Sequence, residues 1–369
     1  MSVAATTSQL ATTAIKTGTF DPVIRTLPIL VLFPHNRCNC RCVMCDIWRI
    51  RQTRRITVRD IEPHVESIRQ LQVRWVVFSG GEPQLNQDFE ALCSLLRAAG
   101  IRLTLLTAGL LLEPRALHVS RLMDDVIVSL DGPRGIHNEI RVVPQAFERL
   151  SRGLEALRRA RPQITVGGRC TVQRANCKAL RATVCAAKSL SLNFVSFLAA
   201  DLTSQAFNRP EEWSSARQNE VAPDAALVDQ LEREVEELIL EHSEDIRLGY
   251  ISESPEKLRR IVFHFRAHLG QMRASAPRCN APWVSAVIEA DGTVRPCFFQ
   301  PALGNIHDGS LLDVLNSERA VRFRETLDVA NNPVCQTCVC SLYLTEEKIA
   351  AMEILKGTQS AAVGGNQRT

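Results

Sequence analysis

The sequence predicts an α/β protein: a partial (β/α)6 barrel followed by a small α+β domain. Six short apolar runs alternate with segments whose apolar residues recur at helical spacing. A cysteine-rich loop follows the first of these runs, and a second group of cysteines surrounds a hairpin-like segment much later in the chain. Because alternating strands and helices form parallel sheets through right-handed crossovers, we expect an open barrel with one unclosed side.

The six predicted strands are rich in branched aliphatic residues, as parallel strands buried on both faces are. They cover residues 28–33, 75–78, 101–107, 125–130, 164–172 and 194–199. The helices predicted between them cover residues 61–71, 89–98, 117–123, 147–157 and 179–190. Barrels and open α/β sheets carry their chemistry at the carboxyl ends of the strands, so the loops that follow the strands form the candidate site.

The loop after the first strand contains Cys38, Cys42 and Cys45 in the spacing C-x3-C-x2-C. Three thiolates on a cluster of four irons leave one iron open to a further ligand, as catalytic metal sites leave a position free. The spacing alone also allows a structural zinc ion, with Cys40 or His35 as the fourth ligand.

The second strand ends in the segment Gly80-Gly81-Glu82-Pro83. Residues of this kind also mark ordinary turns, but here they stand directly behind a strand and downstream of the cysteine motif. The combination resembles the radical S-adenosylmethionine (SAM) enzymes and makes zinc a remote alternative. The resemblance implies a catalytic 4Fe–4S cluster on the three cysteines, whose open iron chelates SAM. The resemblance further implies that one electron cleaves SAM to a 5′-deoxyadenosyl radical, and that Gly80, Gly81 and Glu82 bind the amino group of SAM.

The same resemblance suggests further contacts with SAM at later strand ends. It implies that Met44 packs near the adenine, that Ser129 reaches the ribose, and that Arg169 binds the carboxylate. Arg169 is equally compatible with a salt-bridged barrel residue. Asp131 either lies near the reacting centre or belongs to a simple turn, Asp-Gly-Pro.

The second informative region is a predicted hairpin over residues 284–294, with Asp291-Gly292 as its turn. Cys279 precedes this hairpin and Cys297 follows it, so we expect it to bring the two thiols together. After the hairpin, Ser310 is placed to cap a short amphipathic helix.

Two further thiols, Cys335 and Cys338, lie in a C-x2-C segment, and Cys340 follows them. The set resembles the auxiliary-cluster domain of radical SAM enzymes, called twitch in its short form and SPASM in its longer form. The resemblance implies one auxiliary 4Fe–4S cluster on Cys279, Cys297, Cys335 and Cys338, with Cys340 as the substitute ligand. Four thiolates also suit structural zinc, which remains the alternative for this second site.

The expected domain division follows from these motifs. It comprises a disordered tail at 1–22, the barrel at 23–200, a loop and helical bridge at 201–275, the auxiliary-cluster domain at 276–345, and a C-terminal helix and disordered tail at 346–369. Within the bridge we expect a loop at 201–221 and helices at 225–242 and 255–272. The bridge either closes over the barrel mouth or serves as a rigid spacer.

Composition agrees with an enzyme of this class. Of the 369 residues 44 are Lys or Arg and 40 are Asp or Glu, and the net charge of +4 gives no reason to expect a nucleic-acid partner. No apolar run is long enough to cross a membrane. The thirteen cysteines predict a reducing, cytoplasmic compartment. Those outside the two motifs are expected to be small buried residues: Cys93, Cys170, Cys177 and Cys185.

The reaction that these parts predict is hydrogen abstraction from a substrate, followed by oxidation with the auxiliary cluster as electron relay. A small-molecule dehydrogenation fits best, and a peptide- or protein-modifying enzyme is the alternative. A more distant alternative is a cluster-binding sensor or scaffold without turnover. The expected partners are a small-molecule or peptide substrate and a reductant such as flavodoxin or ferredoxin.

Overall fold

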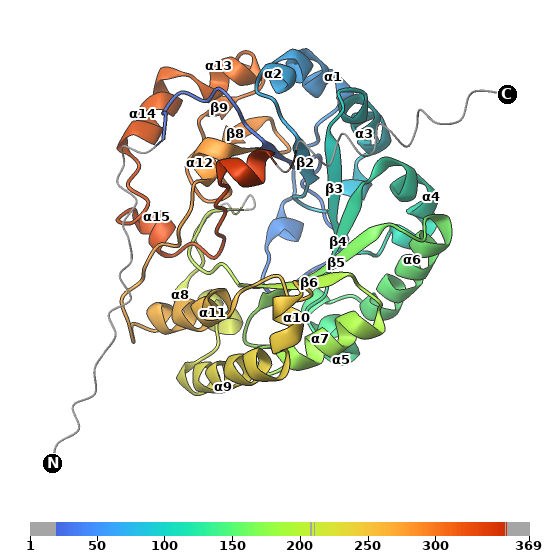
Figure 1. Ribbon diagram of the computed structural model, residues 1–369, viewed down its shortest axis with the longest axis vertical. Helices are drawn as coiled ribbons and strands as arrows, with labels where there is room; N and C mark the ends of the chain where they lie inside the picture. The colour runs from blue at the N-terminus through green and yellow to red at the C-terminus, as the bar shows by residue number, and fades with distance from the viewer. Residues whose placement is uncertain (1–19, 207–208, 210, 351, 353–369) are drawn as a thin grey trace.

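The computed structural model describes residues 20–206, 209, 211–350 and 352 of the chain (Figure 1). Its strands are β1 (Ile29–Leu32), β2 (Trp75–Phe78), β3 (Arg102–Thr107), β4 (Asp125–Ser129), β5 (Thr165–Val172), β6 (Phe194–Ala199), β7 (Ser285–Ile288), β8 (Thr293–Arg295) and β9 (Gly304–Asn305). They form one sheet in the order β6-β5-β4-β3-β2-β1-β7-β8-β9. The first six strands are parallel and follow one another in space, which confirms the partial barrel.

Helices connect the barrel strands and cover the outer face of the sheet (Figure 1). They are α1 (Val58–Ile61), α2 (Val65–Gln70), α3 (Phe89–Ala98), α4 (Leu112–Leu122), α5 (Arg134–Arg141), α6 (Ala146–Ala160) and α7 (Leu180–Ser189). After the barrel come α8 (Ser215–Val221), α9 (Ala225–Glu241), α10 (Ser243–Arg247) and α11 (Pro255–His268). The C-terminal part adds α12 (Ala281–Val284), α13 (Leu311–Leu315), α14 (Glu318–Thr326) and α15 (Pro333–Gln336).

Alternate residues of the barrel strands pack on opposite faces, as the two-residue period of a strand requires. Val76 and Phe78 of β2 are fully buried in the large cluster beneath the helices. Trp75 and Val77 of the same strand pack instead in a separate cluster with Ile29, Val31, Phe33 and Val287. The apolar runs of the sequence therefore serve two cores, one outside and one inside the barrel.

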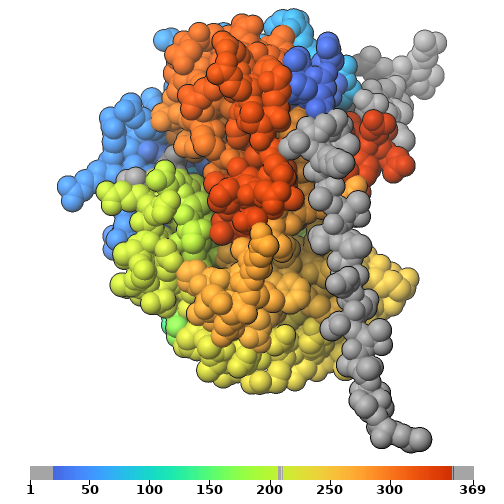
Figure 2. All heavy atoms as spheres, turned by 90° about the vertical axis from the view of Figure 1, so that its left-hand side faces the viewer, coloured from blue at the N-terminus to red at the C-terminus, as the bar shows by residue number. Residues whose placement is uncertain are grey.

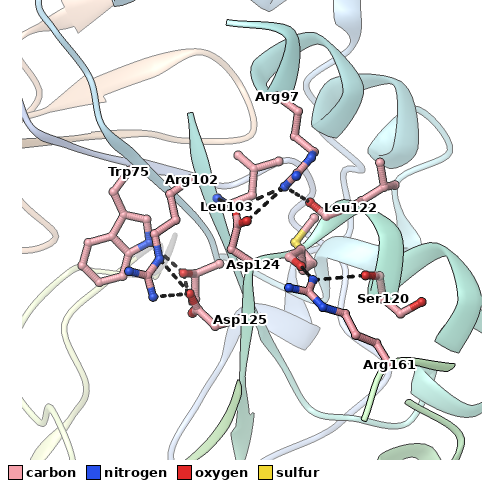
Figure 3. A network of polar contacts seen from close by, with 11 residues as sticks. Trp75, Arg97, Arg102, Leu103, Ser120, Leu122, Asp124, Asp125 and Arg161 are labelled. Atoms are coloured by element: carbon pink, nitrogen blue, oxygen red, sulfur yellow. Dashed lines mark hydrogen bonds and ion pairs between the residues drawn. The ribbon is translucent and has the colours of Figure 1, made fainter. Parts of the chain in front are cut away.

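Polar ties fasten the amino ends of the strands, as Figure 3 shows. Arg102, the first residue of β3, pairs with Asp125, the first residue of β4, at an N–O distance of 2.7 Å. Arg97 of α3 pairs with Asp124 at 3.2 Å. Arg161 donates hydrogen bonds to two carbonyl groups at and just after the end of α4. These contacts join the amino ends of the strands to adjacent strands and helices. The candidate site lies at the opposite, carboxyl end of the sheet.

The C-terminal strands extend the barrel sheet, a placement that the sequence did not predict. β7 lies parallel to β1, with Ile29 opposite Ser285, and β8 and β9 add antiparallel pairs. The predicted hairpin forms, and Gly292 at its turn has a φ of +85°, which favours glycine. Ser310 accepts a hydrogen bond from the backbone of Asp313 and caps α13 as predicted.

Two expectations from the sequence are wrong, and one helix was missed. Part of the predicted loop at 201–221 is the helix α8, which begins because Ser214 accepts a hydrogen bond from the backbone N–H of Arg217. The helix α5 was not predicted, although Pro133 directly precedes it. Cys185 is exposed on α7, whereas Cys93, Cys170 and Cys177 are buried as expected.

Two further expectations concern the termini. Most of the tail predicted at residues 1–22 lies outside the described residues, which begin at Phe20. Residues 346–350 are helical, as expected, and the tail predicted beyond them lies outside the described residues apart from Met352.

Candidate functional site

One chamber of about 250 Å³ opens at the carboxyl ends of the barrel strands. The sequence-predicted residues that line it are Cys38, Cys42, Met44, Cys45, Gly80, Gly81, Glu82, Ser129 and Arg169. They come from the loops after β1 and β2 and from the strands β4 and β5. The fold therefore gathers every residue to which the resemblance gave a SAM or catalytic-cluster role, as expected where parallel strands end at one edge.

The cysteine loop rests on the C-terminal end of α5. The backbone N–H groups of Arg41 and Val43 donate hydrogen bonds to the carbonyl groups of Arg141 and Ile140, at 3.2 Å and 3.1 Å. The last carbonyls of a helix have no partner within it, so they are free to accept from another segment. This unpredicted helix thus holds the backbone between the first and third cysteines.

A buried charge network lies behind the same loop. The Arg141 guanidinium donates one hydrogen bond to Cys42 Sγ at 3.4 Å and pairs with the Asp131 carboxylate at 2.5 Å. Asp131 also accepts from the backbone of Thr171, and its own N–H donates to His137 Nδ1. Asp131 is fully buried and does not line the chamber. Its role in the structure is to orient Arg141 toward the cysteine loop.

The thiols of the loop suit an anionic iron–sulfur cluster. The hydrogen bond from Cys40 and the charge of Arg141 lower the pKa of Cys42 to about 7, against the effect of burial. Burial raises the pKa of Cys45 to about 12, so this thiol needs a metal to become a thiolate at neutral pH. The backbone N–H of Cys40 points at Cys38 Sγ, 3.4 Å away. Three chamber-facing sulfurs with cationic and N–H donors behind them fit a cluster with one open iron.

The two glycines after β2 allow that loop to approach the cysteine loop closely. A Cβ on Gly81 would stand 2.1 Å from the carbonyl oxygen of Arg37, the residue before Cys38. Gly80 has a φ of +100°, and a Cβ there would meet Phe33 at 2.8 Å. Any larger residue would push the second loop away from the first, which explains why the sequence needs the pair of glycines.

The buried side chain of Glu82 links the ends of two strands through hydrogen bonds. One carboxylate oxygen accepts from the Thr107 hydroxyl at 2.8 Å and from the backbone N–H of Ala108 at 3.0 Å. The other accepts from the backbone N–H of Gln84 at 3.3 Å. Burial raises the pKa of Glu82, and these hydrogen bonds oppose the rise. The carboxylate thus joins the ends of β2 and β3, so a contact of the Gly80–Glu82 segment with SAM would come from its backbone.

Sequence reasoning missed a second set of residues around the chamber, in the segment after β6. Trp213 donates its indole N–H to Asp46 at 2.7 Å, just beyond the last cysteine of the loop. Arg217 pairs with Asp46 and also donates to the carbonyl of Val43. Arg209, stacked on Trp213, lines the chamber. No local motif announces these contacts, because their partners lie more than 160 residues away in the chain.

Arg169 lies on β5, opposite Ser129 of β4, and its Nε donates to the Ser196 hydroxyl at 3.2 Å. Within the described part of the chain it forms no ion pair, although it lies close enough to Glu253 for its charge to lower the pKa of that carboxyl. Its guanidinium keeps donors for a ligand in the chamber. Its SAM-carboxylate role stays a prediction.

The four predicted auxiliary ligands converge from three separate segments. Burial raises the pKa of Cys297, Cys335 and Cys338, and Cys279 lies close enough to each of them to raise it further. The backbone N–H of Ala281 donates to Cys279 Sγ at 3.4 Å. Gln300 donates to Cys335 Sγ at 3.2 Å. These donors are suited to stabilise thiolates on a cluster.

Cys340 differs from Cys338 in what it faces. Cys340 lines the chamber that the first three cysteines line, together with Val339 and Phe298. Cys338 does not line that chamber, and it donates its S–H to the carbonyl of Cys340 at 3.0 Å. The choice of Cys338 as the fourth ligand stays a prediction. In the described residues, no group of three or more His, Cys, Asp or Glu side chains is arranged to hold a single metal ion.

Among the described residues, the helices are all too short or too polar to span a lipid bilayer.

Two family models match the chain. Residues 32–172 match the model of the radical SAM superfamily, and residues 279–339 match SPASM, an iron–sulfur cluster-binding domain. The first range contains the cysteine loop and the strands β2 to β5, and the second contains all four predicted auxiliary ligands.

Curated relatives align with part of the chain. An "AdoMet-dependent heme synthase" of Methanosarcina barkeri is 33% identical over 135 residues, which are 33% of this chain and 37% of the relative. An "Fe-coproporphyrin III synthase" of the same organism is 28% identical over 153 residues, 40% of this chain and 38% of the relative. The chain thus spans a little over a third of the length of these relatives.

Solved structures show the same fold over most of the chain. Streptococcus suis SuiB bound to SAM superposes with a TM-score of 0.60 at 14% identity, over 88% of this chain and 74% of that one. Native anSMEcpe with bound SAM superposes with a TM-score of 0.61 at 19% identity, over 92% and 99% of the two chains.

The cofactors that go with these two matched domains are SAM and 4Fe–4S clusters. The barrel, the chamber with its three cysteines, and both family matches lead to one conclusion. Residues 32–172 form a radical SAM domain, and residues 279–339 form a SPASM-type iron–sulfur cluster-binding domain that follows it.

Proposed function

We propose that the protein uses SAM to abstract a hydrogen atom from a small molecule and completes a two-electron oxidation, with an auxiliary cluster accepting the second electron. The observation that carries this proposal is the shared chamber. Cys38, Cys42 and Cys45 form one side of it, and Phe298, Val339 and Cys340 of the C-terminal domain form another. A substrate in this chamber would contact both domains.

The catalytic cluster, when bound and reduced, supplies the electron that cleaves SAM to methionine and the 5′-deoxyadenosyl radical. The residues of the chain would hold the reactants in place for that chemistry. Arg169, which forms no ion pair among the described residues, offers its guanidinium for the carboxylate of SAM, and Met44 and Ser129 line the walls for its adenosine. The chamber surface is mostly apolar, which helps to keep water away from a radical.

The auxiliary site would act at the second step. With Cys279, Cys297, Cys335 and Cys338 as ligands, every iron of a cubane has a protein thiolate, so substrate cannot bind there without displacing one. Electron transfer is then the role that remains. The names of the two curated relatives denote the synthesis of heme and Fe-coproporphyrin III, which are small molecules, and this favours the small-molecule branch for the present chain. A flavodoxin or ferredoxin would supply the first electron.

The test is made on protein purified without oxygen and reconstituted with iron and sulfide. We expect about eight irons per chain and 5′-deoxyadenosine from SAM after dithionite reduction. Two-electron oxidation further predicts one 5′-deoxyadenosine per product and a reduced auxiliary-cluster EPR signal under single turnover. Absence of 5′-deoxyadenosine from protein with full clusters would contradict the proposal, and about four irons would remove the electron relay from it.

A further inference from the structure

A second chamber lies beside the SAM chamber, between α11 and the auxiliary-cluster segment. The two chambers share a wall made of Arg169, Leu198, Ala199, Val339 and Cys340. Figure 2 shows the orange to red C-terminal part of the chain packed directly against the yellow to orange helical segment on this side of the molecule. A ligand lying across the shared wall would therefore reach both chambers.

One stripe along α11 and the residues just before it lines the second chamber. Lys257, Arg260 and His264 follow one another at intervals of three and four residues, which places them on one face of α11, and Glu253 lies just before this helix. An adjacent side of α11 is apolar and fully buried at Leu258 and Phe265. This helix therefore packs by one face and presents a mainly basic face to the chamber.

The cations of the second chamber outnumber its acids. Glu253, the one acid among the lining residues, lies close enough to Arg169 and Lys257 for their charges to lower its pKa. Within the described residues, Arg169, Lys257 and Arg260 form no ion pair, although all three line the chamber. By contrast Arg259, the neighbour of Arg260 on the same helix, pairs with Glu236 at 2.7 Å. Arg260 is half-buried, and its hydrogen bond goes to the carbonyl of Ser275. Burial lowers the pKa of Arg260, and the nearby Cys338 opposes this shift.

The remaining polar groups add little negative charge. Glu253 is the one acid among the lining residues, and its carboxylate accepts a hydrogen bond from the backbone N–H of Phe197 at 2.8 Å. Burial raises the pKa of Glu253 to about 7, so the group is partly protonated at neutral pH. His264 Nε2 is buried without a hydrogen-bond partner. The chamber thus holds three cations, one weakened acid, an unsatisfied ring nitrogen and the thiols of Cys338 and Cys340.

We propose that this second chamber binds a carboxylate of the substrate, with Lys257 and Arg260 as its principal partners. Arg260 can hold the carboxylate with two parallel N–H donors, and Lys257 adds a point charge one helical turn away. The carbon chain of the substrate then passes the wall at Arg169 and Val339 and enters the apolar SAM chamber. This inference rests on the proposed function and adds a substrate class: an organic acid whose reacting carbon lies some way from the carboxylate.

A competing role for these cations is to balance the negative charge of the auxiliary cluster. Arg260 lies near enough to Cys338 for the two charges to interact. Both roles predict a cost when Arg260 is replaced, so activity alone does not separate them. The two roles differ in ligand binding: a counter-charge has no preference among added small molecules, whereas a carboxylate site prefers an anion over its neutral amide.

The probe is hexanoate, with hexanamide as its neutral counterpart, titrated by anaerobic calorimetry into the SAM-bound holoenzyme. We expect hexanoate to bind at least about tenfold more tightly than hexanamide. The substitutions Lys257→Met and Arg260→Met should each weaken hexanoate by about tenfold and leave hexanamide unchanged. The matched control is Arg259→Met, which removes a cation from the outer side of the same helix and should leave hexanoate binding as it was.

Iron content and the auxiliary-cluster reduction potential are measured on each variant. Equal binding of the two probes would overturn the proposal. So would an Arg260→Met variant that shifts the potential and binds hexanoate normally, because the cation would then serve the cluster. Measuring SAM cleavage in the same preparations distinguishes a failure of the carboxylate site from a failure of the proposed function. Protein that cleaves SAM without preferring hexanoate contradicts only the carboxylate site, whereas protein that prefers hexanoate without cleaving SAM contradicts the proposed function.

Discussion

The two groups of cysteines differ in how much chain each needs in order to assemble. Cys38, Cys42 and Cys45 lie within a single loop of eight residues, whereas the auxiliary set extends from Cys279 to Cys338. Bringing distant residues together costs loop-closure entropy, which the packing of intervening elements must offset. The first group is therefore a local property of its loop. The second exists only when α12, the end of β8 and α15 are all in place.

The polar surroundings of the two groups differ as well. The first is backed by a buried ion pair, in which Arg141 touches both Asp131 and Cys42. The second receives hydrogen bonds from neutral donors, the backbone of Ala281 and the side chain of Gln300. A buried ion pair is costly to break, while a neutral donor mainly tunes the sulfur it contacts. The comparison predicts a large structural effect at the first group and a small electronic effect at the second.

The largest expected effect is the loss of SAM cleavage on replacing one cysteine of the first group. Cys42→Ala should lower 5′-deoxyadenosine formation by at least about a thousandfold, because the catalytic cluster loses one of its three protein ligands. The matched control is Cys40→Ala, a buried thiol in the same loop that does not line the chamber. It should retain most of the cleavage. Equal losses in both variants would mean that the ligand set is wrong.

The next effect concerns the fourth auxiliary ligand. Cys338→Ser should lower the iron content from about eight to about four per chain, whereas Cys340→Ser should leave about eight. The reason is that Cys340 lines the shared chamber and Cys338 does not. Iron and sulfide analysis with EPR of the reduced protein measures the difference. The opposite pattern would exchange the two roles.

The ion pair behind the first group predicts a loss of stability. Arg141→Met leaves Asp131 charged and buried without its partner, so the free energy of unfolding should fall by about 3–5 kcal/mol. Urea unfolding of the iron-free protein measures this without interference from cluster loss. The comparison variant is Arg97→Met, whose pair with Asp124 is partly exposed and should contribute only about 0–1 kcal/mol. Similar losses of unfolding free energy in the two variants would show that the ion pair behind the first group contributes no more to stability than a surface pair.

The smallest effect is expected at the auxiliary site. Gln300→Leu removes the hydrogen bond to Cys335 Sγ, which favours the more negative, reduced state of a cluster. The reduction potential should fall by about 40 mV, as expected for about 1 kcal/mol in a one-electron couple. Gln336→Leu is the control, because Gln336 donates to the carbonyl of Ala330 and not to sulfur. A redox titration followed by EPR that finds no difference between the variants would contradict this tuning.

Much of the fold was predictable because its signals are local. The six barrel strands appear near their predicted positions, since each is a short apolar run with helical periodicity on either side. The hairpin turn at Asp291-Gly292 and the cap at Ser310 are also single-segment signals. The helix α5 escaped prediction because its eight residues are mostly polar, and its function is to hold the cysteine loop.

The sequence by itself determined the chemistry of this protein: the C-x3-C-x2-C loop, the glycine pair behind the second strand, and the later thiols with their hairpin. Tertiary structure decided what surrounds that chemistry. It set the C-terminal strands beside β1, Arg141 behind Cys42, Trp213 against Asp46, and a basic face of α11 beside the SAM chamber. The physical reason is that spacing within a loop fixes which ligands can meet, whereas charge pairing and burial depend on segments that meet only after packing.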